Sequence, residues 1–316
     1  MKTLKIFRLG LLLLCVCLLF TGCESTQGYI DFSNMQAQSM DNNDDNMKQT
    51  AKGQPLRIAF ASVLSPREAR QYYQKVVDYV SAKTGRPTVL IQRKTYEELN
   101  MMLSGGECDI AFISTGAYAS YHGMQSIDIL TMAQTYGTVY YQALLIVPAD
   151  SDITDFSQLR GKVMAFTDPI SYSGRLAIDY KLLEEYNTIA EKFFQRCYYT
   201  YNHDKSLWAV ANHLADGAGI DGQVYEYCLK NNPELAKKLR VIETMDPVPT
   251  GPVVIRSDLP ADEKERLREL FINMNNDPNM QVAMARVMID KFVPQIPHAY
   301  DELRSKYNRL AKLPGD

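Results

Sequence analysis

Residues 167–174, TDPISYSG, concentrate hydroxyl groups and a glycine between a predicted strand and a predicted helix. The apolar run at 163–166 is typical of a buried strand, and apolar residues recur at helical spacing after the turn. The first turn of a helix leaves N–H groups unsatisfied and carries partial positive charge, so it attracts anions. Ser171 and Ser173 add hydroxyl donors, and Gly174 lets a ligand approach the backbone. These residue types predict a cradle of neutral donors for a tetrahedral oxyanion.

A second turn of the same kind follows another predicted strand. Ser114 and Thr115 precede Gly116 there, in the part of the chain that we expect to form the other lobe. A serine before a helix is also a common N-cap, and such a cap stabilises a helix by about 1 kcal/mol. One capping residue would meet that need, whereas each of these turns carries several polar or small residues. Two turns that face each other would form a binding site.

The first 22 residues predict export from the cytoplasm. They combine a basic head with an apolar run too short to cross a bilayer. Small residues before Cys23 complete a pattern that resembles a bacterial lipoprotein signal. The resemblance implies cleavage before Cys23 and acylation of that cysteine, which would anchor the protein to a membrane, facing the periplasm or the cell exterior. An ordinary secretory signal or an uncleaved anchor is the alternative.

Composition bounds the rest of the chain. Residues 23–54 are rich in Ser, Gln, Asn, Asp and Met without apolar periodicity, which predicts a flexible tether. Residues 55–316 suffice for one large domain or two lobes.

Removing residues 1–22 deletes three positive and no negative charges, leaving 31 Lys and Arg against 37 Asp and Glu, a net charge of −6. A mildly acidic exported protein without a basic block gives no reason to propose nucleic acid as a partner.

Three cysteines remain in the predicted folded part: Cys108, Cys197 and Cys228. In an oxidising compartment Cys197 and Cys228 could form a disulfide, and buried free thiols are the alternative. No CxxC pair or His/Cys cluster has metal-binding spacing. The sequence therefore predicts neither a metal site nor a cofactor.

Strands and helices alternate after the tether, which indicates an α/β fold with mainly parallel sheets flanked by helices. We expect strands at 56–62, 88–92, 109–113, 127–132, 139–148, 163–166, 197–200, 240–243 and 253–256. We expect helices at 66–84, 96–103, 117–122, 175–186, 206–215 and 224–230, and a mostly helical end over 260–310.

Two strand-like crossings, near residues 139–147 and 249–255, bracket the second α/β unit. They predict that the chain leaves one lobe, builds another and returns. The expected boundaries are 55–141 and 252–316 for lobe 1 and 142–251 for lobe 2. A ligand would bind between the lobes, where hinge closure can bury it.

An ordered set of short motifs resembles the phosphate/phosphite/phosphonate-type solute-binding proteins of ABC importers. The motifs are DIAF at 109–112 with Ser114 and Thr115, DPxSxSG at 168–174, NHD at 202–204 ahead of LWAV at 207–210, and ADGAG at 215–219. The resemblance covers residues 56–276. It implies a two-lobed type II periplasmic-binding fold, a phosphorus oxyanion as ligand, an ABC permease as partner, and capture without chemistry.

The resemblance also assigns roles by position. It places backbone N–H groups of the cradle together with Ser171, Tyr172, Ser173 and Gly174 around the anion. It implies that His203 reaches the anion from lobe 2, the alternative being a solvent-exposed histidine at a helix start. It implies that Tyr96 contributes a phenol from lobe 1, the alternative being a packing aromatic.

The chain departs from this family where a ligand amine would be recognised. Gln223 and Gly251 stand where aminoalkylphosphonate binders place acidic groups, and Tyr172 replaces a common Thr. An ammonium group that enters a dry cleft loses its hydration, and without a carboxylate nothing offsets this cost. We therefore expect phosphate, phosphite or a simple alkylphosphonate, with Gln223 beside it. Asp221 is two positions from Gln223 in the sequence. It would supply the missing negative charge if it occupied the position expected for Gln223.

Three other functions are compatible with the same sequence. A hydrolase would need Ser171 or Ser173 as nucleophile with His203, but no GxSxG elbow is present. A lipoprotein of the same fold could instead report ligand occupancy to a membrane sensor. A ligand other than a phosphorus oxyanion would suit an aromatic cleft lined by Tyr198, Tyr199 and Tyr201.

Overall fold

The computed structural model describes residues 54–61 and 63–312, apart from the side chains of residues 66–68. The predicted signal at 1–22, the lipid site at Cys23 and almost all of the expected tether lie outside the described residues. Within the described ranges, no helix combines the length and the apolar character needed to cross a lipid bilayer.

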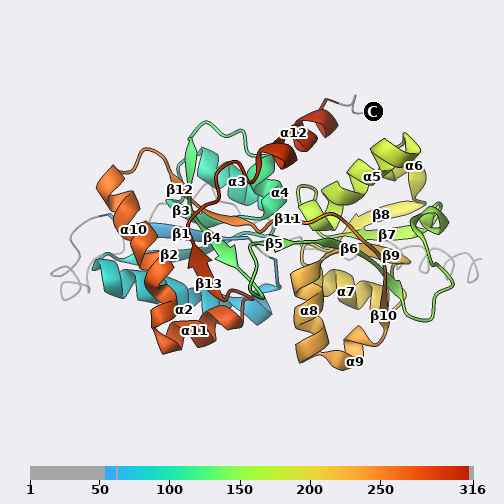
Figure 1. The fold of residues 1–316 in the computed structure, drawn as a ribbon, viewed down its shortest axis with the longest axis horizontal. Helices are drawn as coiled ribbons and strands as arrows, with labels where there is room; N and C mark the ends of the chain where they lie inside the picture. Colours follow the sequence, from blue (N-terminus) through green and yellow to red (C-terminus); the bar gives the residue numbers. More distant parts are fainter. Residues whose placement is uncertain (1–53, 62, 313–316) are drawn as a thin grey trace, which may run out of the picture. The chain divides into compact units, whose positions relative to one another are not determined.

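The first of two large sheets is built from both ends of the described chain (Figure 1). Its strand order is β13-β4-β12-β3-β1-β2. The strands are β1 (Leu56–Phe60), β2 (Thr88–Gln92), β3 (Ile110–Phe112), β4 (Ile127–Gln134), β12 (Pro252–Arg256) and β13 (Lys291–Val293). The accompanying helices are α2 (Pro66–Thr84), α3 (Tyr96–Ser104), α4 (Thr115–Ala119), α10 (Ala261–Asn273), η4 (Met274–Asn276), α11 (Pro278–Ala285) and α12 (Asp301–Leu310).

The second sheet is built from the middle of the chain and has the order β10-β6-β9-β7-β8. Its strands are β6 (Ala143–Pro148), β7 (Val163–Phe166), β8 (Arg196–Tyr199), β9 (Gly217–Asp221) and β10 (Leu239–Thr244). The accompanying helices are η2 (Phe156–Leu159), the π-helical turn η3 (Tyr172–Leu176), α5 (Ala177–Tyr186), α6 (Ala190–Phe193), α7 (His203–Ala211), α8 (Gly222–Asn231) and α9 (Pro233–Ala236). A two-stranded ribbon of β5 (Tyr140–Tyr141) and β11 (Val248–Pro249) connects the two sheets.

The predicted α/β fold of two sheets flanked by helices is confirmed, and each sheet is mixed, with a parallel core extended by antiparallel strands. In the first sheet β1 runs parallel to β2 and β3, whereas β12 and β13 are antiparallel to their neighbours. In the second sheet β7 runs parallel to β8 and β9, whereas β6 is antiparallel to β9 and β10. The antiparallel strands are those by which the chain crosses between the sheets or returns, so their direction depends on long-range connections.

Side-chain alternation explains how each sheet carries helices on both faces. Leu56, Ile58 and Phe60 of β1 pack in one cluster with α2, α10 and α11. Ala59, between them, faces a second cluster with α3 and α4. In the second sheet, α5 and α6 pack with η2 on one face, and α7, α8 and α9 join the cluster on the other. In Figure 1, α5 and α6 lie above the second sheet and α7 to α9 below it.

Helix α12 contacts both halves of the fold. Leu303 is buried beside Ala119 of α4 and Tyr180 of α5. Arg309 of α12 forms an ion pair with Glu184 of α5 at 3.2 Å. This C-terminal helix therefore bridges the part built on the first sheet and the part built on the second.

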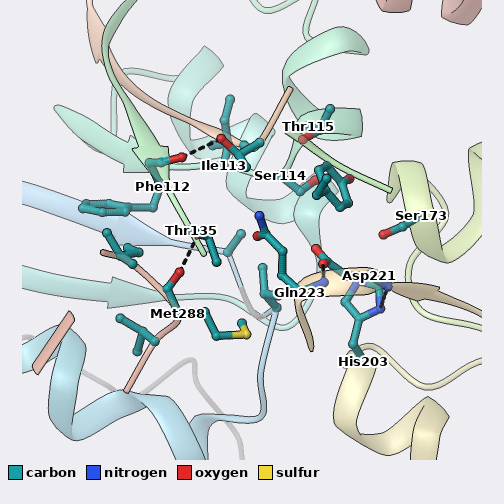
Figure 2. Close-up of a pocket in the computed structure, with 18 of the residues that line it drawn as sticks. Phe112, Ile113, Ser114, Thr115, Thr135, Ser173, His203, Asp221, Gln223 and Met288 are labelled. Atoms are coloured by element: carbon teal, nitrogen blue, oxygen red, sulfur yellow. Dashed lines mark hydrogen bonds between the residues drawn. The ribbon is translucent and has the colours of Figure 1, made fainter. Parts of the chain in front are cut away.

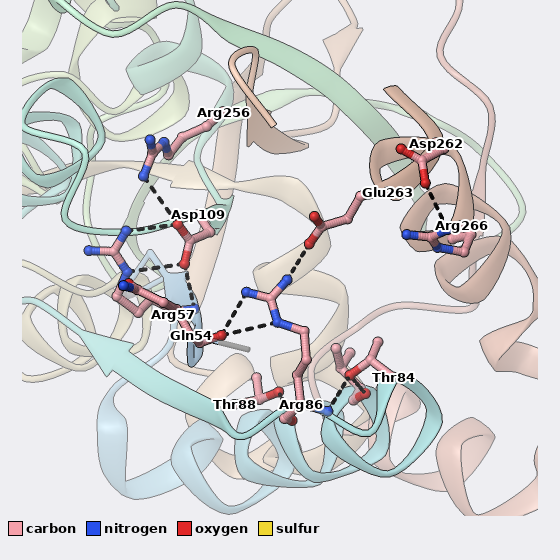
Figure 3. Close-up of polar contacts among 11 residues, drawn as sticks. Gln54, Arg57, Thr84, Arg86, Thr88, Asp109, Arg256, Asp262, Glu263 and Arg266 are labelled. Atoms are coloured by element: carbon pink, nitrogen blue, oxygen red, sulfur yellow. Dashed lines mark hydrogen bonds and ion pairs between the residues drawn. The ribbon is translucent and has the colours of Figure 1, made fainter. Parts of the chain in front are cut away.

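Polar contacts fix the opposite end of the first sheet (Figure 3). The carboxylate of Asp109 accepts two hydrogen bonds from the Arg57 guanidinium and a longer one, at 3.3 Å, from Arg256. These residues join the beginnings of β1 and β3 to the end of β12. Arg86 pairs with Glu263 and donates to the carbonyl of Gln54, where the described chain begins. Asp109, the first residue of the DIAF motif, therefore has a structural role far from the opposite strand ends.

Candidate functional site

A pocket of about 110 Å³ lies between the two sheets, where loops that follow β3 and β7 approach each other (Figure 2). Both hydroxyl-rich turns line it, with Ser114 and Thr115 from one half and Ser171 and Ser173 from the other. Of the other expected ligand residues, the structure brings Tyr96, His203 and Gln223 to the same pocket.

The serines of the two turns cap helices and keep a donor. Ser171 Oγ accepts the Gly174 N–H at 3.1 Å, and Ser114 Oγ accepts the Ala117 N–H at 3.2 Å. A hydroxyl that accepts such a bond still has its own proton to donate. Capping and ligand binding are therefore compatible in these serines.

Tyr172 and Gly174 do not line the pocket, although the sequence placed them in the cradle. The Tyr172 ring is buried behind the loop with Tyr180 and lies edge-on to Tyr141 at 6.3 Å. Its bulk fills the space behind the cradle. The Gly174 N–H is already bonded to Ser171, and its carbonyl accepts the Thr167 N–H.

The hydroxyl of Thr115 also has a partner, because it donates to the carbonyl of Pro249 in the connecting ribbon at 2.8 Å. This bond ties the turn at 114–116 to β11. Thr115 therefore positions the turn, and its backbone N–H rather than its hydroxyl proton is the group left for a ligand.

His203 is buried at the first position of α7, so the alternative of an exposed histidine is wrong. Its Nδ1 accepts the backbone N–H of Asp221 at 3.2 Å and lies 3.2 Å from Thr167 Oγ1. Burial lowers the pKa of His203 to about 3, so the ring is neutral at pH 7. Since Nδ1 accepts, the proton resides on Nε2, and the ring is a neutral donor.

Asp221 also lines the pocket, so the site does contain a carboxylate. It caps α8 by accepting the Gln223 N–H at 2.7 Å, and burial raises its pKa to about 6. Gln223 and Gly251 line the pocket as well. The absence of acids at those two positions therefore does not leave the site without negative charge.

Two buried polar atoms in the pocket have no hydrogen-bond partner. They are the phenol oxygen of Tyr96 and the amide nitrogen Nε2 of Gln223. Burial raises the pKa of Tyr96 well above its ordinary value, so the phenol keeps its proton. Buried polar groups rarely lack a partner, and both of these can donate to an anion.

The described residues that line the pocket include no Lys or Arg. Tyr141 and Thr250 also line the pocket and were not predicted from the sequence; Tyr141 belongs to the connecting ribbon, and Thr250 flanks it. The Tyr141 phenol lies beside Thr115 and Ser173, and burial raises its pKa. No local signal marks either residue, because their place depends on how the two crossings pair. Among the described residues, no group of His, Cys, Asp or Glu could hold a metal ion, and all three cysteines are free.

Two α/β halves joined by a ribbon, with a polar pocket between them, define a solute-binding protein of the type II periplasmic fold. The chain belongs to a family described as "ABC transporter, phosphonate, periplasmic substrate-binding protein", whose model matches residues 58–300. The family consists of binding proteins rather than enzymes.

Individual relatives agree with this membership. The chain is 29% identical over 182 residues to a phosphonates-binding periplasmic protein of Escherichia coli, an alignment that covers 54% of this chain and 53% of the relative. The chain thus spans about half the length of this relative. It is 23% identical over 234 residues to the phosphate-import protein PhnD of Mycolicibacterium smegmatis, covering 70% of this chain and 73% of that protein.

Solved structures share the fold. The structure of PhnD1 from Prochlorococcus marinus in complex with methylphosphonate matches with a TM-score of 0.74 and 15% identity, covering 82% of this chain and 99% of that one. A binding protein component of an ABC phosphonate transporter from Pseudomonas aeruginosa matches with a TM-score of 0.73 and 22% identity, covering 81% and 86%. At these identities the likeness concerns the fold alone.

Proposed function

We propose that this chain is the solute-binding component of an ABC importer and captures a small phosphorus oxyanion in the pocket of Figure 2. The observation that carries the proposal is the pair of unpartnered donors, Tyr96 Oη and Gln223 Nε2. They lie in a pocket that also holds the hydroxyls of Ser171 and Ser173. An anion with several oxygens would accept from all of these groups at once.

Capture would involve binding and release without bond making. Neutral donors hold an anion more weakly than Arg or Lys, because hydrogen bonds between charged partners are stronger. This suits a solute that must be passed on to a permease. The relatives named as phosphonate-binding and phosphate-import proteins support both the ligand class and the importer as partner.

We infer that the β5/β11 ribbon is the hinge between lobe 1, residues 55–141 and 252–316, and lobe 2, residues 142–251. We also propose that residues 1–22 are a signal peptide, that Cys23 carries the lipid anchor and that residues 23–54 are the tether. Cys23→Ser should then release the protein from the membrane fraction. Unchanged membrane association of that variant would contradict the anchor.

The binding proposal is tested by ligand-induced thermal stabilisation with phosphate, phosphite, methylphosphonate and sulfate. A ligand at about 100 times its dissociation constant adds about 2.7 kcal/mol of stability, which is readily measured. The double variant Ser171→Ala, Ser173→Ala should lose this gain and remain folded without ligand. Ser305→Ala, on the exposed side of α12, is the matched control. Full stabilisation of the double variant would contradict the cradle.

A further inference from the structure

Arg175 is a buried cation that follows the cradle within one turn of helix. It belongs to the π-helical turn η3 and lies two residues after Ser173. Arg175 is not among the residues that line the pocket, so it would not contact the solute. A buried charge is costly unless it is paired, and replacing a buried ion pair by apolar residues is often neutral or stabilising. Stability alone therefore does not explain an arginine at this position.

The guanidinium of Arg175 joins the cradle turn to three neighbouring elements. Its Nε donates to Asp179 Oδ2 in α5 at 2.6 Å, and its Nη2 donates to Glu191 Oε1 in α6 at 2.8 Å. Its Cζ lies over the ring of Phe166, the last residue of β7, at 4.4 Å from the centroid. None of these partners lines the pocket. One side chain therefore links η3 to α5, α6 and β7 through residues that the solute would not reach.

The turn that Arg175 links to these elements is wider than an α-helical turn. The N–H of Leu176 donates to the carbonyl of Ser171, five residues earlier, at 3.0 Å. An α-helical bond joins residues four apart, and each residue turns the chain by about 100° about the helix axis. Conversion of η3 to an α-helical turn would therefore rotate Ser171 and Ser173 by about 100° relative to α5.

The charges around Arg175 indicate that its role is geometric. The guanidinium faces two carboxylates, Asp179 and Glu191, which leaves no surplus positive charge to attract an anion. Burial raises the pKa of Asp179 to about 6, so this carboxylate is still ionised at pH 7. What the guanidinium supplies is a planar fork that donates in two directions at once, and a lysine cannot reproduce that geometry.

We propose that Arg175 is the positioning residue of the oxyanion cradle. It holds η3 in its π-helical form, and the hydroxyls of Ser171 and Ser173 keep their direction toward the pocket as a result. The inference rests on the proposed function, because it assigns a role in anion binding to a residue outside the pocket.

A double-mutant cycle with Ser173 tests this inference by isothermal titration with phosphate, phosphite and methylphosphonate. Arg175→Gln should weaken binding about tenfold in the wild-type protein and about threefold in the Ser173→Ala protein, where only the hydroxyl of Ser171 is left to be displaced. A residue that only stabilises the fold would give the same loss in both proteins. Arg175→Lys should recover part of the affinity, since its ammonium can still donate to Asp179.

Arg240→Gln is the matched control, because Arg240 also holds a guanidinium in the second half of the fold. Its Nη2 donates to the carbonyls of Ser151 and Ile153, and none of these residues lines the pocket. This variant should keep the wild-type affinity. Wild-type affinity of a folded Arg175→Gln protein, or equal losses in the two arms of the cycle, would overturn the positioning role and leave the proposed function standing. Binding of none of the three ligands by the wild-type protein would refute both.

Glu191→Ala supplies a second test that leaves the buried guanidinium in place. The Glu191 side chain is 58% exposed, so its removal should not prevent folding, and Arg175 loses one of its two acceptors. We expect binding to weaken about threefold. Glu185→Ala is the control, because Glu185 is 55% exposed and pairs with Lys181 instead. If Arg175→Gln does not fold, equal affinities of Glu191→Ala and Glu185→Ala would overturn the positioning role.

Discussion

Ser114 and Ser171 each combine a helix cap with a free hydroxyl proton, and this combination was visible in the sequence. Both turns were expected at the site, and the structure brings both to one pocket. Asp221 and Tyr141 could not be placed in this way. Their approach to the pocket depends on β9 ending beside β6 and on the pairing of β5 with β11. Residue types and spacing within one turn were readable, whereas neighbours from distant segments were not.

The buried neutral His203 makes stability depend on pH. Its pKa of about 3 in the folded protein lies below the unfolded value of about 6.5, so its contribution is present above 6.5 and lost as pH falls toward 3. The contribution of His203 to the free energy of unfolding should fall by about 1.4 kcal/mol per pH unit in that window. We expect His203→Gln to abolish this fall. The check is urea unfolding of the free protein between pH 7 and 4.

Three carboxyls with raised pKa values, Asp168, Asp179 and Asp221, act in the opposite direction, and the comparison of variant with wild type cancels them. Their stabilising contribution is greatest at low pH and is lost as pH rises, through about 6 for Asp179 and Asp221. The control His213→Gln alters a largely exposed ring and should keep the wild-type slope. The same slope in His203→Gln would contradict the assignment.

Asp221 places a like charge beside the proposed anion once pH exceeds its pKa of about 6. At pH 8 we expect Asp221→Asn to bind phosphate about tenfold more tightly, and at pH 5 the difference should shrink, because the wild-type carboxyl is then protonated. Asn is a good N-cap, so α8 should keep its start. Titration calorimetry at both pH values measures the effect. Weaker binding by the variant at pH 8 would instead show that the carboxylate accepts a hydrogen bond from a protonated oxygen of the ligand.

At the scale of elements, strand β9 shows why part of the fold was missed. Its sequence, GAGID, has two glycines and reads as a turn, since glycine is depleted in strands. The structure explains the glycines by close approach of another backbone. A Cβ on Gly219 would lie 2.5 Å from the carbonyl oxygen of Ser173 in the cradle.

Gly219→Ala should therefore displace the cradle loop. We expect a loss of 1–3 kcal/mol in the free energy of unfolding, about the cost of overpacking, together with weaker anion binding. Chemical denaturation and titration of the same preparation measure both. Gly105→Ala is the control, because a Cβ there meets only ordinary contacts. Equal behaviour of the two variants would contradict a close-packed cradle.

Elements with a local sequence signal were predicted well, and elements defined by distant partners were not. Helix α2 and strand β2 begin and end at the predicted residues, because their apolar pattern and flanking Pro or Gly are local. Helix α7 begins three residues earlier than predicted, at His203. The expected strand at 139–148 divides into β5 and β6, and the three-residue β13 lies in the part expected to be mostly helical. Such short strands are defined by their partners rather than by their own sequence.

At the scale of the whole described fold, the two halves touch at residues that line the pocket. Asp168, fully buried in the second half, accepts the backbone N–H of Tyr96 from the first half at 3.0 Å. The backbone N–H of His203 likewise donates to Val63 at 3.1 Å. Residues from both halves of the fold therefore surround the pocket in this structure.

Asp168→Asn tests whether this contact holds the two halves together. The variant keeps the pocket donors and loses the charge that accepts the Tyr96 N–H, a bond worth about 1.5–3 kcal/mol. We expect anion release to become about tenfold faster or more, measured by surface plasmon resonance. Asp152→Asn, at an exposed position, is the control. Release at the wild-type rate would show that closure does not depend on Asp168.

Helix α12 gives the molecule a second constraint, on the amplitude of its motion. Opening at the β5/β11 ribbon would separate Arg309 from Glu184 and expose Leu303 to water. Residues that never meet the solute would then fix the resting angle of the empty protein. Sequence changes in this last helix could then shift the solute concentration at which uptake begins, although every group that contacts the solute stays the same.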